Sequence, residues 1–115
     1  KVETNGQKLH VTYQLIDIYG REGVLLDKTF NATERDKRSL AHHISDQIYE
    51  QLIGKKGFFS THIAYVLIQG NEGPLKRYNL IVADADGYNP QKLLVSKEPI
   101  MSPRWSYDGK QIAYV

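Results

Sequence analysis

The sequence contains no cysteine among its 115 residues. This absence excludes disulfide frameworks, thiol nucleophiles and cysteine-based zinc sites. No apolar run approaches the roughly 18 residues that a membrane-spanning helix needs, and the first residues do not have the pattern of a secretory signal peptide. The net charge of +2 is small and dispersed along the chain, so it does not indicate a nucleic-acid partner.

The sequence also lacks the short motifs of common enzyme sites. It has no G-x-S-x-G nucleophile elbow and no glycine-rich phosphate loop. Its acidic residues fall mostly in expected turns or in one expected helix. We therefore expect a protein that is not an enzyme, with no catalytic residue and no cofactor or metal site.

One histidine pair resembles a metal site only in part. His42 and His43 lie in the expected helix, and Asp46 follows His42 by four residues, so that His42 and Asp46 share a face. The H-E-x-x-H pairing of helical zinc sites is missing, and a metal site would need a third ligand. An exposed polar face is therefore the favoured interpretation.

The segment Asp84-Ala85-Asp86-Gly87 begins like a calcium-binding loop. Such a loop needs a glutamate at position 12, and that position, counted from Asp84, is Val95. Asp-Gly between two apolar runs is instead a strong hairpin signal, so a hairpin turn is favoured.

A repeat is the most informative feature that the sequence does contain. Ile-Ala-Tyr-Val occurs at Ile63–Val66 and again at Ile112–Val115, an offset of 112 − 63 = 49 residues. Self-similarity at such a period is typical of arrays built from one supersecondary unit. Short apolar runs and turns separate the copies, without an amphipathic helix, which is typical of a β-propeller blade. One blade cannot close a ring, so we expect the chain to be part of a longer protein.

The first half of the chain begins with two expected strands. Apolar and polar residues alternate over residues 9–15, which predicts a strand with one buried face. Residues 24–30 are predicted to form its antiparallel partner, after a glycine-bounded loop.

One amphipathic helix is expected over residues 34–53, where apolar residues recur at intervals of four. Thr33 and Asp36 have the spacing of a capping box, and Gly54 is the expected left-handed residue at the helix end. We expect the apolar stripe of this helix to be buried against the two strands.

The second half predicts short extended segments without a helix, over residues 63–68, 78–83, 92–95, 104–106 and 111–115. The first of them is apolar at all six positions, so we expect it to be covered on both faces. The change of pattern near residues 57–62 divides the chain into two domains, residues 1–60 and 61–115. The predicted fold class is α+β.

The end of the chain resembles the repeat of TolB-type propellers. Residues 102–115 read S-P-R-W-S-Y-D-G-K-Q-I-A-Y-V, and the family pattern is P-x-W-S-P-D-G-x-x-[ILV]-A-[FY]-V. The resemblance implies that Trp105 packs between blades and that Asp108 and Gly109 form a tight turn. Tyr107 stands where the family prefers proline, which loses a preset φ but not the turn.

The preceding half is similar to the same family. Residues 43–66 resemble its junction, in which a helix of type S-D-[EQ]-[IV]-[FY]-E-x-L-x-G leads through K-G-x-F into the first propeller strand. Residues 11–17 resemble a strand of the preceding domain, and residues 84–89 resemble the turn S-D-x-D-G-x-N of the first blade. The resemblance implies the end of an N-terminal α/β domain over residues 1–60, and the first blade and the start of the second over residues 61–115.

The function implied by the resemblance is that of a non-catalytic scaffold. TolB-family proteins are periplasmic components of the Tol–Pal envelope system, which supports outer-membrane integrity and cell division. Their partners are the lipoprotein Pal, the inner-membrane protein TolA and colicins that enter through the system. The family's TolA contact corresponds to a segment before residue 1 and its Pal and colicin site lies largely on later blades, so no partner-binding residue is assigned here.

Two further expectations follow. The propeller repeat also occurs in front of some serine peptidases, so the entrance domain of such a peptidase stays open as an alternative function. In family propellers a strand from the far C-terminus completes the first blade. Without it, residues 63–68 would expose an apolar edge, and we expect the chain to self-associate through exposed strand edges.

Overall fold

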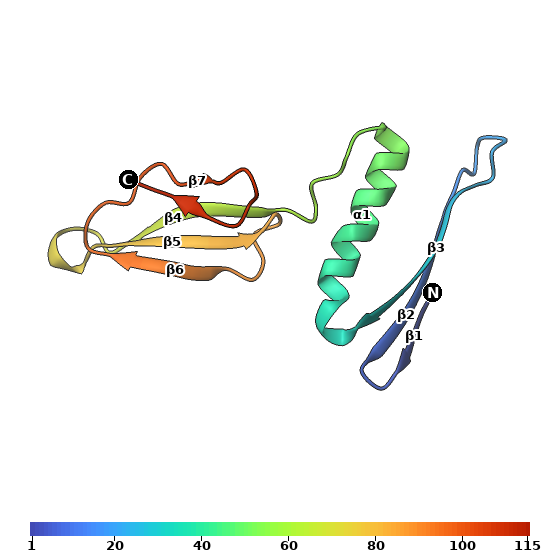
Figure 1. The fold of residues 1–115 in the computed structure, drawn as a ribbon, viewed down its shortest axis with the longest axis horizontal. Coiled ribbons are helices and arrows are strands. Elements are labelled where there is room, and N and C mark those ends of the chain that lie inside the picture. The colour runs from blue at the N-terminus through green and yellow to red at the C-terminus, as the bar shows by residue number, and fades with distance from the viewer. The chain divides into compact units, whose positions relative to one another are not determined.

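The computed structural model describes all residues from 1 to 115, which form two compact units, Lys1–Ser60 and Thr61–Val115 (Figure 1). Unit 1 contains β1 (Val2–Asn5), β2 (Lys8–Ile16), β3 (Val24–Thr33), the 3₁₀ turn η1 (Glu34–Asp36) and α1 (Lys37–Ile53). Unit 2 contains β4 (His62–Gln69), the 3₁₀ turn η2 (Gly73–Leu75), β5 (Arg77–Asp84), β6 (Gln91–Ser96), β7 (Arg104–Trp105) and β8 (Ile112–Ala113). The combination of one helix with antiparallel sheets is α+β, as predicted.

The sheet of unit 1 is antiparallel, with the strand order β1-β2-β3. The long hairpin of β2 and β3 was predicted from its alternating pattern. The first strand, β1, was not predicted. It is joined to β2 by a turn in which Gly6 adopts a φ of +63°. With only four residues, all of them exposed, β1 gives no hydrophobic period.

The start of α1 differs from the predicted capping box. The Thr33 hydroxyl donates a hydrogen bond of 2.6 Å to Asp36 Oδ2 instead of accepting one from a first-turn amide. Residues Glu34–Asp36 form a 3₁₀ turn, and the α-helix begins at Lys37 rather than Glu34. The helix end is as predicted, since Gly54 is left-handed at φ +74° and its N–H donates to Glu50 O.

The helix α1 packs beside the β1-β2-β3 sheet (Figure 1). Tyr13 donates a hydrogen bond of 2.6 Å from its hydroxyl to Gln47 Oε1, and burial raises the pKa of Tyr13. The predicted burial of the apolar stripe is only partial, because Leu52 and Ile53 at the helix end are 59% and 56% exposed. The three strands cover only part of a helix of 17 residues.

Unit 2 is built on an antiparallel sheet with the strand order β4-β5-β6. Its core lies along β5, where neighbouring side chains are buried in succession: Asn79, Leu80, Ile81 and Ala83. The buried Asn79 amide is satisfied, because its Nδ2 donates to Leu67 O at 3.1 Å. β5 is the central strand of this sheet, and its side chains are buried on both faces.

The prediction that residues 63–68 are covered on both faces is wrong. Ile63 and Leu67 are each 40% exposed and Ile68 is 53% exposed. The physical reason is topological, because β4 is an edge strand and has a neighbour on one side only.

A separate two-stranded sheet ends the chain. Arg104 of β7 lies opposite Ala113 of β8, and Trp105 lies opposite Ile112. Beyond these pairs, Met101 and Val115 exchange two backbone hydrogen bonds of 2.8 and 3.0 Å. No helix in the structure combines the length and the apolar character that crossing a bilayer requires.

Candidate functional site

The predicted repeat residues Trp105, Asp108 and Gly109 come together in the hairpin between β7 and β8. Gly109 adopts a φ of +69°, a region that residues with a Cβ rarely occupy, and its N–H donates to Ser106 O at 3.0 Å. Asp108 Oδ1 accepts from the Ser106 hydroxyl at 2.6 Å and from Lys110 N–H at 3.1 Å. The hydrogen bond from Ser106 is the main cause that holds the pKa of Asp108 below its usual value.

Ser106 is a turn residue that the sequence reasoning missed. Its Oγ donates to Asp108 and also accepts from Gln111 N–H at 3.0 Å, while its own N–H donates to Gln111 O at 2.8 Å. The serine of the W-S-x-D-G pattern therefore ties the two strands across the turn. Tyr107, which replaces the family's proline, is fully exposed, so this departure leaves the turn intact.

Trp105 lines two hollows of unit 2. One, of about 420 Å³, is bounded by side chains of β5 and β6, among them Leu80 and Leu94, and by Ile112 of the hairpin. The other, of about 260 Å³, lies between Trp105, Gly109 and residues 61–62. The indole, which belongs to the hairpin, thus faces residues of the β4-β5-β6 sheet, which is consistent with the inter-blade role that the resemblance implies.

The first-blade turn, residues 84–89, closes the hairpin between β5 and β6. Gly87 adopts a φ of +80° and its N–H donates to Asp84 O at 2.8 Å. Asp86 Oδ1 accepts from Tyr88 N–H at 3.0 Å. The side chain of Asp84 lies 3.7 Å from His62 Nε2, so this turn also contacts the start of β4.

Asp46 joins α1 to the segment that follows it. Its Oδ1 accepts from Phe59 N–H at 2.7 Å, and its Oδ2 accepts from the N–H and the hydroxyl of Ser60 at 3.0 and 2.5 Å. The Ser60 hydroxyl is the main cause that lowers the pKa of Asp46; the two backbone N–H groups and His43 act in the same direction, against the effect of burial. An exposed polar face is therefore the wrong interpretation for Asp46, which anchors the junction.

Glycine is required at position 57, where the junction (residues 54–60, which follow α1) passes close to the helix. A Cβ at this position would lie 2.6 Å from Asp46 Cα and 2.2 Å from Asp46 Oδ1, closer than real Cβ contacts. This contact gives the K-G-x-F pattern a physical reason, since only glycine lets the chain pass α1 at this distance.

Aromatic residues accompany the same junction. The rings of Phe58 and Phe59 stack with their centres 4.8 Å apart, and Tyr49 of α1 meets each of them edge-on at 6.0 Å. An apolar hollow of about 330 Å³ lies beside them on α1, bounded in part by Leu52 and Phe59. The segment that leaves α1 is therefore held by both polar and apolar contacts.

The two helix histidines have different neighbours. His43 meets the Phe30 ring edge-on at 5.6 Å, and its Nε2 lies 3.1 Å from Gln47 Nε2. The ring of His42 lies one turn from Arg38, with 3.3 Å between His42 Nε2 and the guanidinium. The two rings therefore have separate neighbours, with His42 half-buried and His43 exposed.

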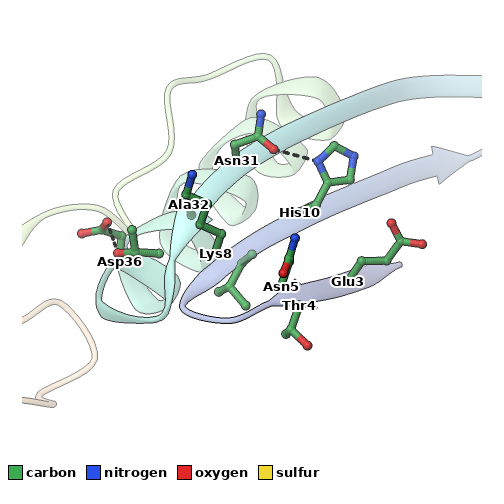
Figure 2. Close-up of a pocket in the computed structure, with 10 residues that line it drawn as sticks. Glu3, Thr4, Asn5, Lys8, His10, Asn31, Ala32 and Asp36 are labelled. Carbon is green, nitrogen blue, oxygen red and sulfur yellow. Dashed lines mark hydrogen bonds between the residues drawn. The ribbon is translucent and has the colours of Figure 1, made fainter.

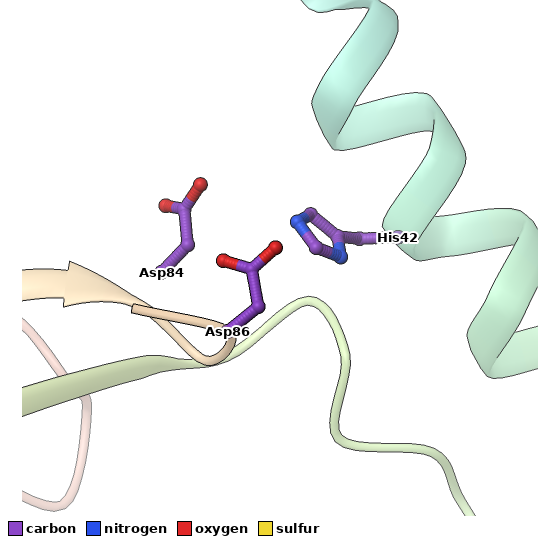
Figure 3. A group of neighbouring side chains, drawn as sticks. All are labelled: His42, Asp84 and Asp86. Carbon is purple, nitrogen blue, oxygen red and sulfur yellow. The ribbon is translucent and has the colours of Figure 1, made fainter. Parts of the chain in front are cut away.

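Figure 3 draws three side chains whose atoms are of the kind that bind metals. His42 belongs to α1 of unit 1, whereas Asp84 and Asp86 belong to the turn after β5 in unit 2. Because His42 and the two aspartates belong to different compact units, these residues are assigned no common site.

An open groove of about 910 Å³ lies at one end of the β1-β2-β3 sheet (Figure 2). His10 and Asn31 are hydrogen-bonded across it at 2.7 Å, and Thr33 donates to Asp36 at its rim. These polar groups are already engaged within the sheet and the helix start, which makes the groove part of the framework of unit 1.

The geometry of unit 2 defines a class of protein. A three-stranded antiparallel sheet is followed by a W-S-x-D-G hairpin that leads into a second Ile-Ala-Tyr-Val segment. Short antiparallel sheets joined by such repeated hairpins are typical of β-propeller proteins.

The comparisons with known proteins name the family. Residues 49–115 match the model of the TolB beta propeller domain, and the chain belongs to the TolB family. The chain is 52% identical over its whole length to the Tol-Pal system protein TolB of Legionella pneumophila (strain Paris) and 53% identical over 95% of its length to that of Coxiella burnetii (strain RSA 493 / Nine Mile phase I). The crystal structure of TolB from Acinetobacter baumannii covers 98% of the chain with a TM-score of 0.87 and 38% identity.

These matches cover only part of each relative. The chain spans 27% of the Legionella protein, 25% of the Coxiella protein and 28% of the Acinetobacter chain.

Proposed function

We propose that this chain is a segment of a non-catalytic, periplasmic scaffold protein of the Tol–Pal system. In this proposal residues 1–60 are the end of the N-terminal α/β domain, and residues 61–115 are the first blade and the start of the second. The single observation that supports it best is the similarity to TolB along the whole chain, across both the helix junction and the propeller repeat. A propeller in front of a serine peptidase shares only the repeat.

The proposed partners are Pal and TolA, with colicins as molecules that exploit the same system. The turns and the junction described above have structural roles, because their polar groups are satisfied by neighbouring backbone and side chains. We therefore assign no partner-contact residue to this chain and place the Pal site on blades beyond residue 115.

The test is a pull-down of Pal with the full-length parent protein that contains this sequence. The 115-residue chain serves as the matched comparison, and both proteins are first checked for folding by circular dichroism. We expect the full-length protein to retain Pal and the 115-residue chain to retain little or none. A folded, monodisperse full-length protein that does not associate with Pal would overturn the proposed function. Equal retention by the 115-residue chain would instead contradict only the placement of the Pal site.

A further inference from the structure

The junction, residues 54–60, turns back along α1 and is hydrogen-bonded to the helix through its last two residues. Gly54 ends α1 with a φ of +74°, and a Cβ at this position would meet nothing within 4 Å. The backbone N–H groups of Phe59 and Ser60, together with the Ser60 hydroxyl, donate to the carboxylate of Asp46. Asp46 lies about two turns before the helix end, so the junction runs beside the last part of α1 and ends on a single acceptor group.

The residue that follows the junction is bonded to unit 2. Thr61 O accepts from Ala85 N–H at 3.0 Å, and β4 begins at His62. Two consecutive residues, Ser60 and Thr61, are thus hydrogen-bonded within different units. As long as Asp46 holds the junction, the chain passes from one unit to the other without a flexible linker.

Little buried apolar surface holds the junction on α1. None of its residues is buried; only Gly57 and Phe59 are half-buried, and Phe58 is 56% exposed. The two phenylalanine rings stack on each other and meet Tyr49 edge-on. Segments with few buried apolar contacts open at a lower free-energy cost than the unit to which they belong. The Asp46 carboxylate therefore contributes much of the closing free energy, because hydrogen bonds to a charged acceptor are stronger than neutral ones.

We propose that the junction opens and closes as one segment while α1 and the β1-β2-β3 sheet stay folded, and that Asp46 sets the balance between the two states. In the open state residues 55–60 form a flexible linker between the units. The hinge is Gly54, which adopts its left-handed conformation without strain and has open space around it. An extended chain spans at most about 3.3–3.6 Å per residue, so opening adds up to roughly 20 Å of linker.

Two adjacent lysines make the open state measurable. Lys55 and Lys56 lie in the junction and are exposed, and trypsin cleaves after lysine. A protease must bind several residues of extended backbone, which the junction does not offer while it is held on α1. The rate of cleavage of a transiently opened segment follows the population of its open form.

The first test is amide hydrogen exchange on the full-length parent protein that contains this sequence, measured by mass spectrometry with fragmentation that resolves single amides. We expect the Phe59 and Ser60 amides to be protected, but to exchange at least about tenfold faster than the α1 amides of residues 44–52. Equal rates in the two segments would show that the junction opens only when unit 1 unfolds, and would overturn the proposal. Unprotected Phe59 and Ser60 amides would also overturn it, because there would be no closed state.

The second test is limited digestion of the same protein with trypsin, with mass spectrometry to follow cleavage after Lys55 or Lys56. Asp46→Asn should raise the initial rate of this cleavage about tenfold or more. Ser60→Ala removes one of the three hydrogen bonds and should raise the rate by a smaller factor. The matched control is Glu50→Gln, at an exposed position of α1, which should leave the rate unchanged.

The two junction variants also give the results that would contradict the proposal. Cleavage after Lys55 at the unsubstituted rate in both Asp46→Asn and Ser60→Ala would show that Asp46 does not hold the junction closed. An equal rise in cleavage after Lys37, at the start of α1, would show that the substitutions unfold unit 1 instead of opening the junction. Either result would overturn the proposal.

Discussion

The two three-stranded sheets of this chain are stabilised in different ways. In β5 of unit 2, Leu80 and Ile81 point to opposite faces, and each is only 3% exposed. In β2 of unit 1, Leu9 is the one buried side chain. Unit 2 therefore has a continuous apolar core, whereas unit 1 depends more on contacts at its surface.

The outer face of the unit 1 sheet carries a row of polar pairs. Three directly opposed positions of β2 and β3 are hydrogen-bonded through their side chains: His10 with Asn31 at 2.7 Å, Thr12 with Thr29 at 3.1 Å, and Gln14 with Asp27 at 2.8 Å. Exposed cross-strand pairs contribute about 0.2–1 kcal/mol each. The comparison teaches that unit 2 should be sensitive to loss of apolar volume, and unit 1 to loss of polar contacts.

The largest expected effect is at two neighbouring residues of β5, and it tests the contrast between the two units. Leu80→Ala and Ile81→Ala should each lower the free energy of unfolding of unit 2 by about 2–5 kcal/mol, because each leaves a cavity in a buried face. The corresponding neighbours in β2 should differ, with Val11→Ala destabilising unit 1 and Thr12→Ala changing it by less than about 1 kcal/mol.

Urea unfolding measures the two units separately in the same sample. Trp105 is the chain's single tryptophan and reports on unit 2, while the circular dichroism of α1 reports on unit 1. A near-neutral Leu80→Ala or Ile81→Ala would show that one face of β5 is not core, and the contrast with β2 would then be lost.

The elements that the sequence predicted are those with a local signal. The hairpin of β2 and β3 follows from alternation, and the end of α1 follows from Gly54. The exposure of β4 was not predictable from its composition, because six consecutive apolar residues look alike in a central strand and in an edge strand. Which strand is central depends on pairing partners, and these are a property of the whole sheet.

The role of Asp46 was missed for a related reason. Its partners, Phe59 and Ser60, lie 13 and 14 residues further along the chain, outside the spacings at which helical residues meet. Gly57 was the available signal, because a glycine just after a helix end often marks a close approach of two backbone segments. The repeat turn was easier to predict, because its signal, Asp108-Gly109, consists of two adjacent residues.

The intermediate effect concerns the polar contacts of unit 1. Asp46→Asn should destabilise unit 1 by about 1–3 kcal/mol, because a charged acceptor of several hydrogen bonds is lost. The folded-state pKa of Asp46 is below its unfolded value, so its carboxylate stabilises unit 1 above the ordinary aspartate pKa of about 4, and this stabilisation is lost as the pH falls through the folded value. The measurement is the urea midpoint of the α1 signal between about pH 3 and pH 7.

The matched control is Glu50→Gln, which removes a carboxylate from an exposed position one turn further along α1. It should leave the Phe59 and Ser60 amides as protected from hydrogen exchange as in the unsubstituted chain, whereas Asp46→Asn should release them. The Trp105 signal of unit 2 should not change in either variant. Equal acid sensitivity of Asp46→Asn and the unsubstituted chain would show that other groups cause the loss of stability at low pH.

The smallest expected effect tests whether polar contacts matter in unit 2 as well. Ser106→Ala removes a hydroxyl that donates to Asp108 and accepts from Gln111 N–H, and it should lower the stability of unit 2 by no more than about 1 kcal/mol. Tyr107→Ala, at a fully exposed side chain of the same turn, is the control and should be neutral. Trp105 fluorescence follows both variants, because the indole lies next to the turn. A loss from Ser106→Ala as large as that from Leu80→Ala would mean that the turn, and not the apolar face of β5, holds the hairpin in place.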